Sequence, residues 1–73
     1  MDANVIFCSL MLKEARKAAK KAKVKIGKLT TWKDTSSPNG YFEVWERPQI
    51  IWQGSAFNAS EAKANAIFAK IDE

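Results

Sequence analysis

The fold is decided by the stretch YFEVWE, residues 41–46. Apolar and polar side chains alternate along it, and this period of two is typical of a β-strand that buries one of its faces. Phe42 and Val44 are therefore expected to point into the core. Tyr41 and Trp45, together with the glutamate between the two buried positions, are expected to point away from it.

Shorter strands are predicted on either side of this stretch. Residues 29–33 have the composition of a strand, and the loop that follows them ends in Asn39-Gly40, a pair that favours a hairpin turn because both residues tolerate positive φ. On the other side, a turn at 47–49 leads into a short strand at 50–52. The middle of the chain is thus predicted to be a three-stranded antiparallel meander.

A helix at about 59–71 is predicted to cover this sheet. Asn58 and, three positions later, Glu61 have the form of a capping box, which satisfies the free N–H groups at the start of a helix. Apolar residues occupy most of the circumference of this helix: Ala62, Ala64, Ala66, Ile67, Phe68, Ala69 and Ile71. A helix of this kind is expected to lie across the sheet and to close the core.

A first helix is predicted at residues 9–23, with Ser9 as its N-cap and Gly27 beyond its end as a terminator. An advance of 100° per residue places six apolar residues on one side: Met11, Leu12, Ala15, Ala18, Ala19 and Ala22. Four of the six are alanine, so this face can approach another element closely but buries little area. We therefore expect this helix to be weakly anchored, or to have a second partner.

Residues 1–73 are predicted to form a single small α+β domain in the order helix, three-stranded antiparallel meander, helix. The conformation of residues 1–8 is left open, because they can extend the first helix, form a short strand or remain a flexible N-terminal arm. The most apolar segment of the chain begins within them and consists of Val5, Ile6, Phe7, Leu10 and Met11. Cys8, which lies between these residues, is expected to be a buried apolar residue. If this segment is exposed, it provides an anchor for a partner protein, with these candidate residues: Val5, Ile6, Phe7 and Leu10.

Charge is strongly segregated along the chain. Between residues 13 and 33 there are nine basic residues and one acidic residue, whereas residues 34–73 contain six acidic and three basic ones. On the first predicted helix, the basic residues cover the side opposite the apolar one: Lys13, Arg16, Lys17, Lys20, Lys21 and Lys23. Such a surface fits a partner with negative charge, either an RNA or DNA backbone or an acidic protein face. The competing interpretation is a solvated face that keeps the protein soluble, although such faces usually mix both signs.

One tryptophan falls in each predicted strand: Trp32, Trp45 and Trp52. Tryptophan on a small sheet is most often part of the core, because its ring buries a large apolar area. The functional alternative is an exposed aromatic platform on which bases or a partner's side chains stack. Trp45 and Tyr41 are the candidates for stacking, since the alternation places both on the face opposite Phe42 and Val44.

The composition argues against catalysis and against a bound metal or cofactor. The chain has no histidine and one cysteine, so it lacks the commonest general base and the ligands of a zinc site. Its three glycines form no phosphate-binding loop, and no segment approaches the roughly 20 apolar residues of a membrane span. Cysteine usage and the lack of a signal-peptide pattern fit the cytoplasm. We therefore expect a non-enzymatic protein that has no cofactor, no small-molecule substrate and no membrane partner.

The predicted order of elements resembles that of the double-stranded RNA-binding domain, over most of the chain. The run SPNG at 37–40 stands where that family has a glycine-proline pair and a histidine, and AKANA at 62–66 matches the alanine repeat of its last helix. Ser60 and Glu61 stand where the family has paired lysines. The resemblance implies binding to RNA, while a glutamate at that position would repel the phosphates.

The small size, the lysine-rich helix and the scarcity of motifs also resemble bacteriophage proteins that regulate host RNA polymerase. This resemblance implies binding to the largest subunits of bacterial RNA polymerase inside the host cell, with inhibition of initiation and antitermination. In this hypothesis the apolar N-terminal residues anchor the protein, and the basic helix faces nucleic acid or an acidic polymerase surface. Two alternatives stay open: a domain that binds nucleic acid directly, and an inhibitor of another host complex such as a defence nuclease.

Overall fold

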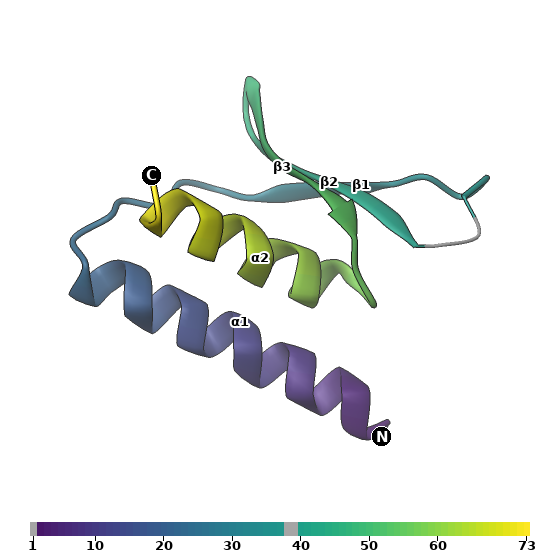
Figure 1. Cartoon of the computed structure of the whole chain (residues 1–73), viewed down its shortest axis with the longest axis horizontal. Helices are drawn as coiled ribbons and strands as arrows, with labels where there is room; N and C mark the ends of the chain where they lie inside the picture. The colour runs from purple at the N-terminus through teal and green to yellow at the C-terminus, as the bar shows by residue number, and fades with distance from the viewer. Residues whose placement is uncertain (1, 38–39) are drawn as a thin grey trace.

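The computed structural model describes residues 2–37 and 40–73, which form two helices and a three-stranded antiparallel sheet (Figure 1). The elements are α1 (Ala3–Lys21), β1 (Thr30–Lys33), β2 (Tyr41–Glu46), β3 (Gln49–Ser55) and α2 (Ala59–Ile71). The predicted small α+β domain and its order of elements are confirmed. The bounds of β2 and α2 are as predicted, whereas β3 is longer than the predicted strand at 50–52.

The elements form three layers, with α2 in the middle (Figure 1). One side of α2 packs against the sheet, where it contacts all three strands, and the other side packs against α1. Within the described part of the chain, α1 contacts α2 but none of the strands. The expectation that the last helix lies across the sheet is confirmed, and the same helix also separates the sheet from α1.

The sequence of α2 explains its central position. Its fully buried residues fall on two faces: Ala62 and Ala66, four positions apart, lie on one, whereas Ala64 and Ile67, three apart, lie on the other. A helix that is apolar on both faces is stable only when both are covered. Because three of these four residues are alanine, its neighbours approach closely, and Ile67 is the largest fully buried side chain of the described chain.

The predicted capping of α2 is present in a shifted form. The side-chain oxygen of Asn58 accepts a hydrogen bond from the backbone N–H of Glu61 at 2.9 Å, as in a capping box. The carboxylate of Glu61 accepts from the N–H of Phe57 at 3.0 Å, one residue before the N-cap. The start of α2 is therefore fixed by the side chain of its N-cap and by a side chain from its first turn.

The alternation along β2 is confirmed. Phe42 and Val44 are buried against α2, and Val44 lies opposite Trp52 of β3 in the antiparallel register. An irregularity in the β2–β3 pairing follows, because Trp45 pairs with Ile50 and leaves Ile51 without an opposite residue. Such a bulge increases the local twist of the strands.

The turn before β2 is only partly described. Of the predicted pair Asn39-Gly40, Asn39 lies outside the described residues, as does Pro38. Gly40 has a φ of 62°, and its carbonyl accepts a hydrogen bond from the N–H of Ala56 at 3.0 Å. A Cβ at this position would lie 2.8 Å from the Ala56 carbonyl oxygen, so glycine is required by both the backbone angle and the close approach.

The predicted start of the first helix is wrong. The helix begins at Ala3 instead of residue 9, and its N-cap is Asp2, whose carboxylate accepts from the N–H of Asn4 at 2.8 Å. Ser9 lies inside the helix and is exposed. Of the conformations considered for residues 1–8, the structure has the extension of the helix from Ala3 onward. Cys8 is buried on the packed side, as expected, and this contact favours helix over a loose arm.

The predicted end of the first helix also needs correction, since the helix stops at Lys21 and Gly27 is not its terminator. Gly27 instead donates its N–H to the carboxylate of Glu46 on β2, at 2.6 Å. The other carboxylate oxygen of Glu46 accepts from the ammonium of Lys70 on α2, at 2.7 Å. Glu46 thereby joins the segment after α1, the sheet and the end of α2.

Replacing Ile67 with alanine is expected to destabilise the fold more than any other single truncation of a side chain. The substitution leaves a cavity between the layers and should lower the free energy of unfolding by about 2–5 kcal/mol, whereas Ile67→Val should lower it by about 0.5–1.5 kcal/mol. Urea denaturation followed by circular dichroism measures both. Equal, small effects of the two variants would contradict the central position of α2.

Glu46 is expected to make stability depend on pH. The hydrogen bond from Lys70, followed by that from Gly27, holds the pKa of Glu46 below its usual range. Because the folded pKa is lowered, the stabilisation is complete above the unfolded value of about 4.3 and is lost as pH falls through the folded pKa. Glu46→Gln should lower the free energy of unfolding by about 1 kcal/mol at pH 7, since both side chains of the ion pair are about a quarter exposed. Urea titrations from pH 7 to pH 3 should show that the difference in free energy of unfolding between the wild type and Glu46→Gln decreases below about pH 4.3. A difference that stays constant over this range would exclude the ion pair as its cause.

Candidate binding surfaces

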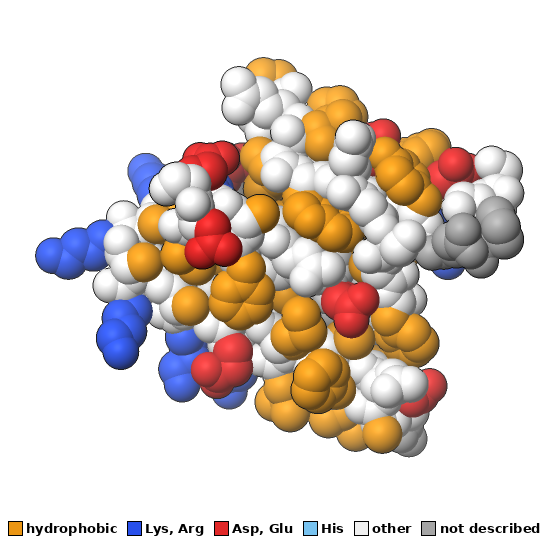
Figure 2. Space-filling view, viewed as in Figure 1, with side chains coloured by type: hydrophobic (Ala, Val, Ile, Leu, Met, Phe, Trp, Pro, Cys, Tyr) orange, Lys and Arg blue, Asp and Glu red, His pale blue; other side chains and the backbone are white. Residues whose placement is uncertain are grey.

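The first two turns of α1 expose a cluster of large apolar side chains. Because Cys8 faces α2, its neighbours Ile6, Phe7 and Leu10 are turned to solvent, with 45%, 62% and 55% of their surface exposed. Val5 is exposed at the edge of the same cluster. We call Val5, Ile6, Phe7 and Leu10 the apolar patch; hydrophobic side chains are visible over this end of α1 in Figure 2. The candidate anchor residues are thus exposed in the first two turns of one helix.

The second half of α1 and the turn after it expose the six basic residues that the sequence places opposite the apolar side of the helix. We call them the basic end: Lys13, Arg16, Lys17, Lys20, Lys21 and Lys23. Among the described residues, the only ion pair of this set joins Lys17 to Glu14, at 3.8 Å between two largely exposed side chains, so it contributes little stability. Lys25 and Lys28 are exposed as well and continue the positive charge beyond the helix. Blue side chains accordingly project from this end of the molecule in Figure 2.

The apolar patch and the basic end are separate surfaces of one helix. Phe7 and Lys20 are thirteen residues apart, which corresponds to about 20 Å along a helix axis. Neither surface is covered by another helix or strand, because α2 is the one such element that α1 contacts in the described chain. Lys20 and Lys21 also lie in the last turn of α1, where positive charge interacts favourably with the helix dipole.

Lys23 occupies a backbone position that normally belongs to glycine. Its φ is 59°, in the left-handed region. Lys23 donates its N–H to the carbonyl of Lys20 at 3.1 Å, and Val24 donates to Ala19 at 2.9 Å, which together form a Schellman motif. A side chain with a Cβ is disfavoured at this position, so a lysine here maintains the positive charge at a cost in stability.

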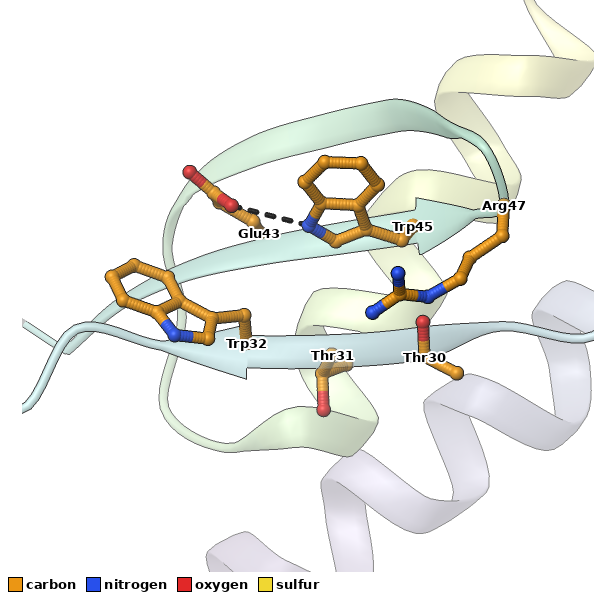
Figure 3. A pocket seen from close by; sticks show the side chains of 6 residues that line it. All are labelled: Thr30, Thr31, Trp32, Glu43, Trp45 and Arg47. Carbon is orange, nitrogen blue, oxygen red and sulfur yellow. Dashed lines mark hydrogen bonds between the residues drawn. The ribbon is translucent and has the colours of Figure 1, made fainter.

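The face of the sheet turned away from α2 carries a second group of candidate residues. No helix or strand of the described chain covers this face. A hollow of 440 Å³ on it is lined by Thr30, Thr31, Trp32, Glu43, Trp45 and Arg47 (Figure 3). Trp32 lies opposite Glu43 in the register between β1 and β2, and Trp45 lies opposite Thr30.

Hydrogen bonds fix the polar and aromatic groups of this face. The carboxylate of Glu43 accepts from the indole N–H of Trp45 at 3.1 Å, and its second oxygen lies 3.4 Å from the hydroxyl of Tyr41. The same hydroxyl lies 3.0 Å from the side-chain oxygen of Gln53. Desolvation, followed by the charge of Glu43, raises the pKa of Tyr41. Tyr41 is therefore a neutral hydrogen-bond donor near pH 7.

The three tryptophans differ in their surroundings. Trp52 faces α2 and packs against the core. Trp45 is half-buried, and the guanidinium of Arg47 lies over its ring at 5.5 Å from the centroid. Trp32 is 51% exposed.

The sequence prediction for stacking named Trp45 and Tyr41, and the structure places both on the open face, as the alternation predicts. It missed Trp32, the most exposed ring of the three. The missing information was the register between β1 and β2, which puts Trp32 beside Glu43. If the length of the hairpin turn were known from the sequence, counting residues back from the turn would give this register.

Other chemistry is poorly supported by the described residues. Cys8 is buried, with its sulfur 3.9 Å from the carboxylate of Glu61; desolvation and the negative charge of Glu61 raise the pKa of the Cys8 thiol. No group of three or more His, Cys, Asp or Glu side chains is close enough to hold a metal ion among the residues that the structure describes. In residues 2–37 and 40–73 there is also no helix with the length and apolar character needed to span a bilayer.

Neither a protein-family model, nor a curated protein, nor a solved structure matches this chain.

Lys23→Gly is expected to stabilise the protein, because glycine adopts the left-handed conformation without strain. The free energy of unfolding should rise by about 0.5–1 kcal/mol, as measured by urea denaturation. Lys23→Ala is the matched control, since it removes the same charge but keeps a Cβ in the left-handed region. Stabilisation by alanine equal to that by glycine would assign the effect to the charge instead of the backbone.

Proposed function

We propose that this protein is a non-enzymatic regulator that uses α1 to dock on bacterial RNA polymerase, where it inhibits initiation, promotes antitermination, or does both. The observation that carries the proposal is the division of α1 into an exposed apolar patch and an exposed basic end. The choice of polymerase as the target comes from the resemblance to bacteriophage regulators.

The apolar patch has the spacing of a helix that inserts into a groove. Ile6, Phe7 and Leu10 occupy positions i, i+1 and i+4, so their side chains lie along one side of the helix. Large apolar side chains that are exposed together on a small protein usually mark an interaction site. The alanine-rich face of α1 packs against α2, and no other helix or strand of the described chain contacts α1. A partner groove that covers the apolar patch would provide α1 with a second packing neighbour.

The basic end supports a target that also carries negative charge. Its cations are exposed, and their charge is hardly neutralised by neighbouring carboxylates in the described chain. A transcription complex offers protein grooves close to nucleic-acid phosphates, which suits two surfaces about 20 Å apart on one helix. Contacts with phosphate would make the affinity fall as the salt concentration rises.

The alternative function is direct binding to nucleic acid without a protein target. It is favoured by the basic end alone and does not use the apolar patch. The two proposals therefore differ in the effect of substitutions at Phe7 and Leu10.

Replacing Phe7 or Leu10 with alanine is expected to weaken binding to purified bacterial RNA polymerase. Each substitution should reduce the affinity about tenfold or more, or ~1.4 kcal/mol, because central apolar anchors dominate the energy of such interfaces. Fluorescence anisotropy of the labelled protein, after nuclease treatment of the polymerase, measures this effect. Ile50→Ala is the matched control, since Ile50 is an exposed apolar residue on β3.

The charge-reversing variant Lys20→Glu/Lys21→Glu should weaken binding to polymerase that retains its nucleic acid, and should make this binding less dependent on salt. Circular dichroism checks that each variant is folded. Failure of the wild-type protein to bind nuclease-treated polymerase would overturn the polymerase proposal. Binding to nucleic acid that is unaffected by Phe7→Ala but lost in Lys20→Glu/Lys21→Glu would support the alternative.

A further inference from the structure

We infer that the open face of the sheet is a binding site for single-stranded nucleic acid, with a base stacked on Trp32 and the backbone phosphates at Arg47 and Lys28. This inference goes beyond the proposed function, because it uses none of the residues of the apolar patch or the basic end. It can therefore fail or hold independently of polymerase binding.

The first observation is the aromatic lining of the 440 Å³ hollow. Trp32 and Trp45 line it from neighbouring strands, and Figure 3 shows the two indoles standing apart with Glu43 beside them. Half of the surface of Trp32 is exposed, although tryptophan has the largest apolar ring available for burial. An exposed indole on a fixed strand is a suitable platform for a flat, unpaired base.

The second observation is positive charge at the edge of the hollow. Arg47 lines the hollow, and it also lines an adjoining one of 410 Å³ that includes Lys28. The two hollows share Thr30 and Arg47, so they adjoin at the start of β1. A nucleotide with its base at Trp32 can thus direct its phosphates toward Arg47 and Lys28.

The acidic residues in these hollows do not oppose this arrangement. Glu46, which lines the second hollow, is paired with Lys70 at 2.7 Å. Glu43 accepts hydrogen bonds from Trp45 and Tyr41, and it lies at the aromatic end of the site instead of the basic end. A carboxylate there accepts hydrogen bonds from the N–H groups of a base.

Glu43 also distinguishes the two kinds of anionic partner. An acidic peptide would place carboxylates along the whole site and so bring one of them close to Glu43. A nucleic acid separates its charge from its bases, and this separation matches the division between the basic and the aromatic ends of the site. A duplex fits less well, because its stacked bases offer no free face to Trp32.

The test uses the whole chain and a fluorescein-labelled RNA of about 12 nucleotides that forms no hairpin, with anisotropy measured between about 50 and 200 mM salt. Trp32→Ala is expected to weaken binding about 5- to 100-fold and leave the salt dependence unchanged. Trp32→Phe should restore most of the affinity, since it keeps a stacking ring. Arg47→Gln should lower the slope of log affinity against log salt by about one.

Matched controls are Phe68→Ala, an exposed aromatic residue on α2, and Lys63→Gln, a cation on the same helix. Both should bind RNA as the wild-type protein does. Binding of unlabelled RNA should also quench tryptophan fluorescence in the wild-type protein, and this quenching should be much smaller in Trp32→Ala.

Three results would overturn the inference. The first is undetectable binding of the RNA by the wild-type protein, and the second is equal affinity of Trp32→Ala and the wild type. The third is displacement of the RNA by an oligoglutamate peptide at a similar concentration, which would assign the face to an acidic protein. A loss of affinity for single strands in Trp32→Ala, with the affinity for a duplex of the same length unchanged, supports the inference.

Discussion

The burial of α2 on two sides is the constraint on which the rest of the structure depends. The helix has Ala62 and Ala66 on one face and Ala64 and Ile67 on the other, all without exposed surface. Since small side chains allow close approach, one helix can serve as the core of both neighbouring layers. As a consequence, α1 and the sheet each have one covered side, and each leaves its other side to solvent (Figure 1). The candidate binding surfaces lie on these two uncovered sides.

Local signals in the sequence were sufficient for the central elements of the fold. The alternation at residues 41–46 and the cap at Asn58 and Glu61 predict β2 and α2 with the bounds that the structure has. Both signals involve neighbours in sequence, which is why they can be recognised without knowledge of the fold. The start of α1 was predicted wrongly because two competent caps were present, Asp2 and Ser9, and the burial of Cys8 against α2 favours the earlier one. The order of the three layers depends on contacts between distant residues and was not predictable from periodicity.

The candidate sites show the same difference between features set by sequence neighbours and features set by contacts between distant residues. The chemistry of the apolar patch and the basic end is visible in the sequence, because both are short segments of one helix. The exposure of these two surfaces is not visible in the sequence, because it depends on the absence of a strand beside α1 in the described chain. On the sheet, alternation alone placed Trp45 and Tyr41 on the open face. The roles of Trp32 and Arg47 required the register and the shape of the hollow, which join residues of two strands and a turn.

The central layer of this fold follows the other two layers in chain order. During synthesis, α1 and all three strands leave the ribosome before α2, yet in the described chain α2 is the helix that covers each of them. Neither the apolar side of the sheet nor the alanine face of α1 has its packing partner until α2 is available. The domain is therefore expected to fold only after α2 has left the ribosome, and the exposed apolar residues of α1 are accessible to other proteins throughout that time.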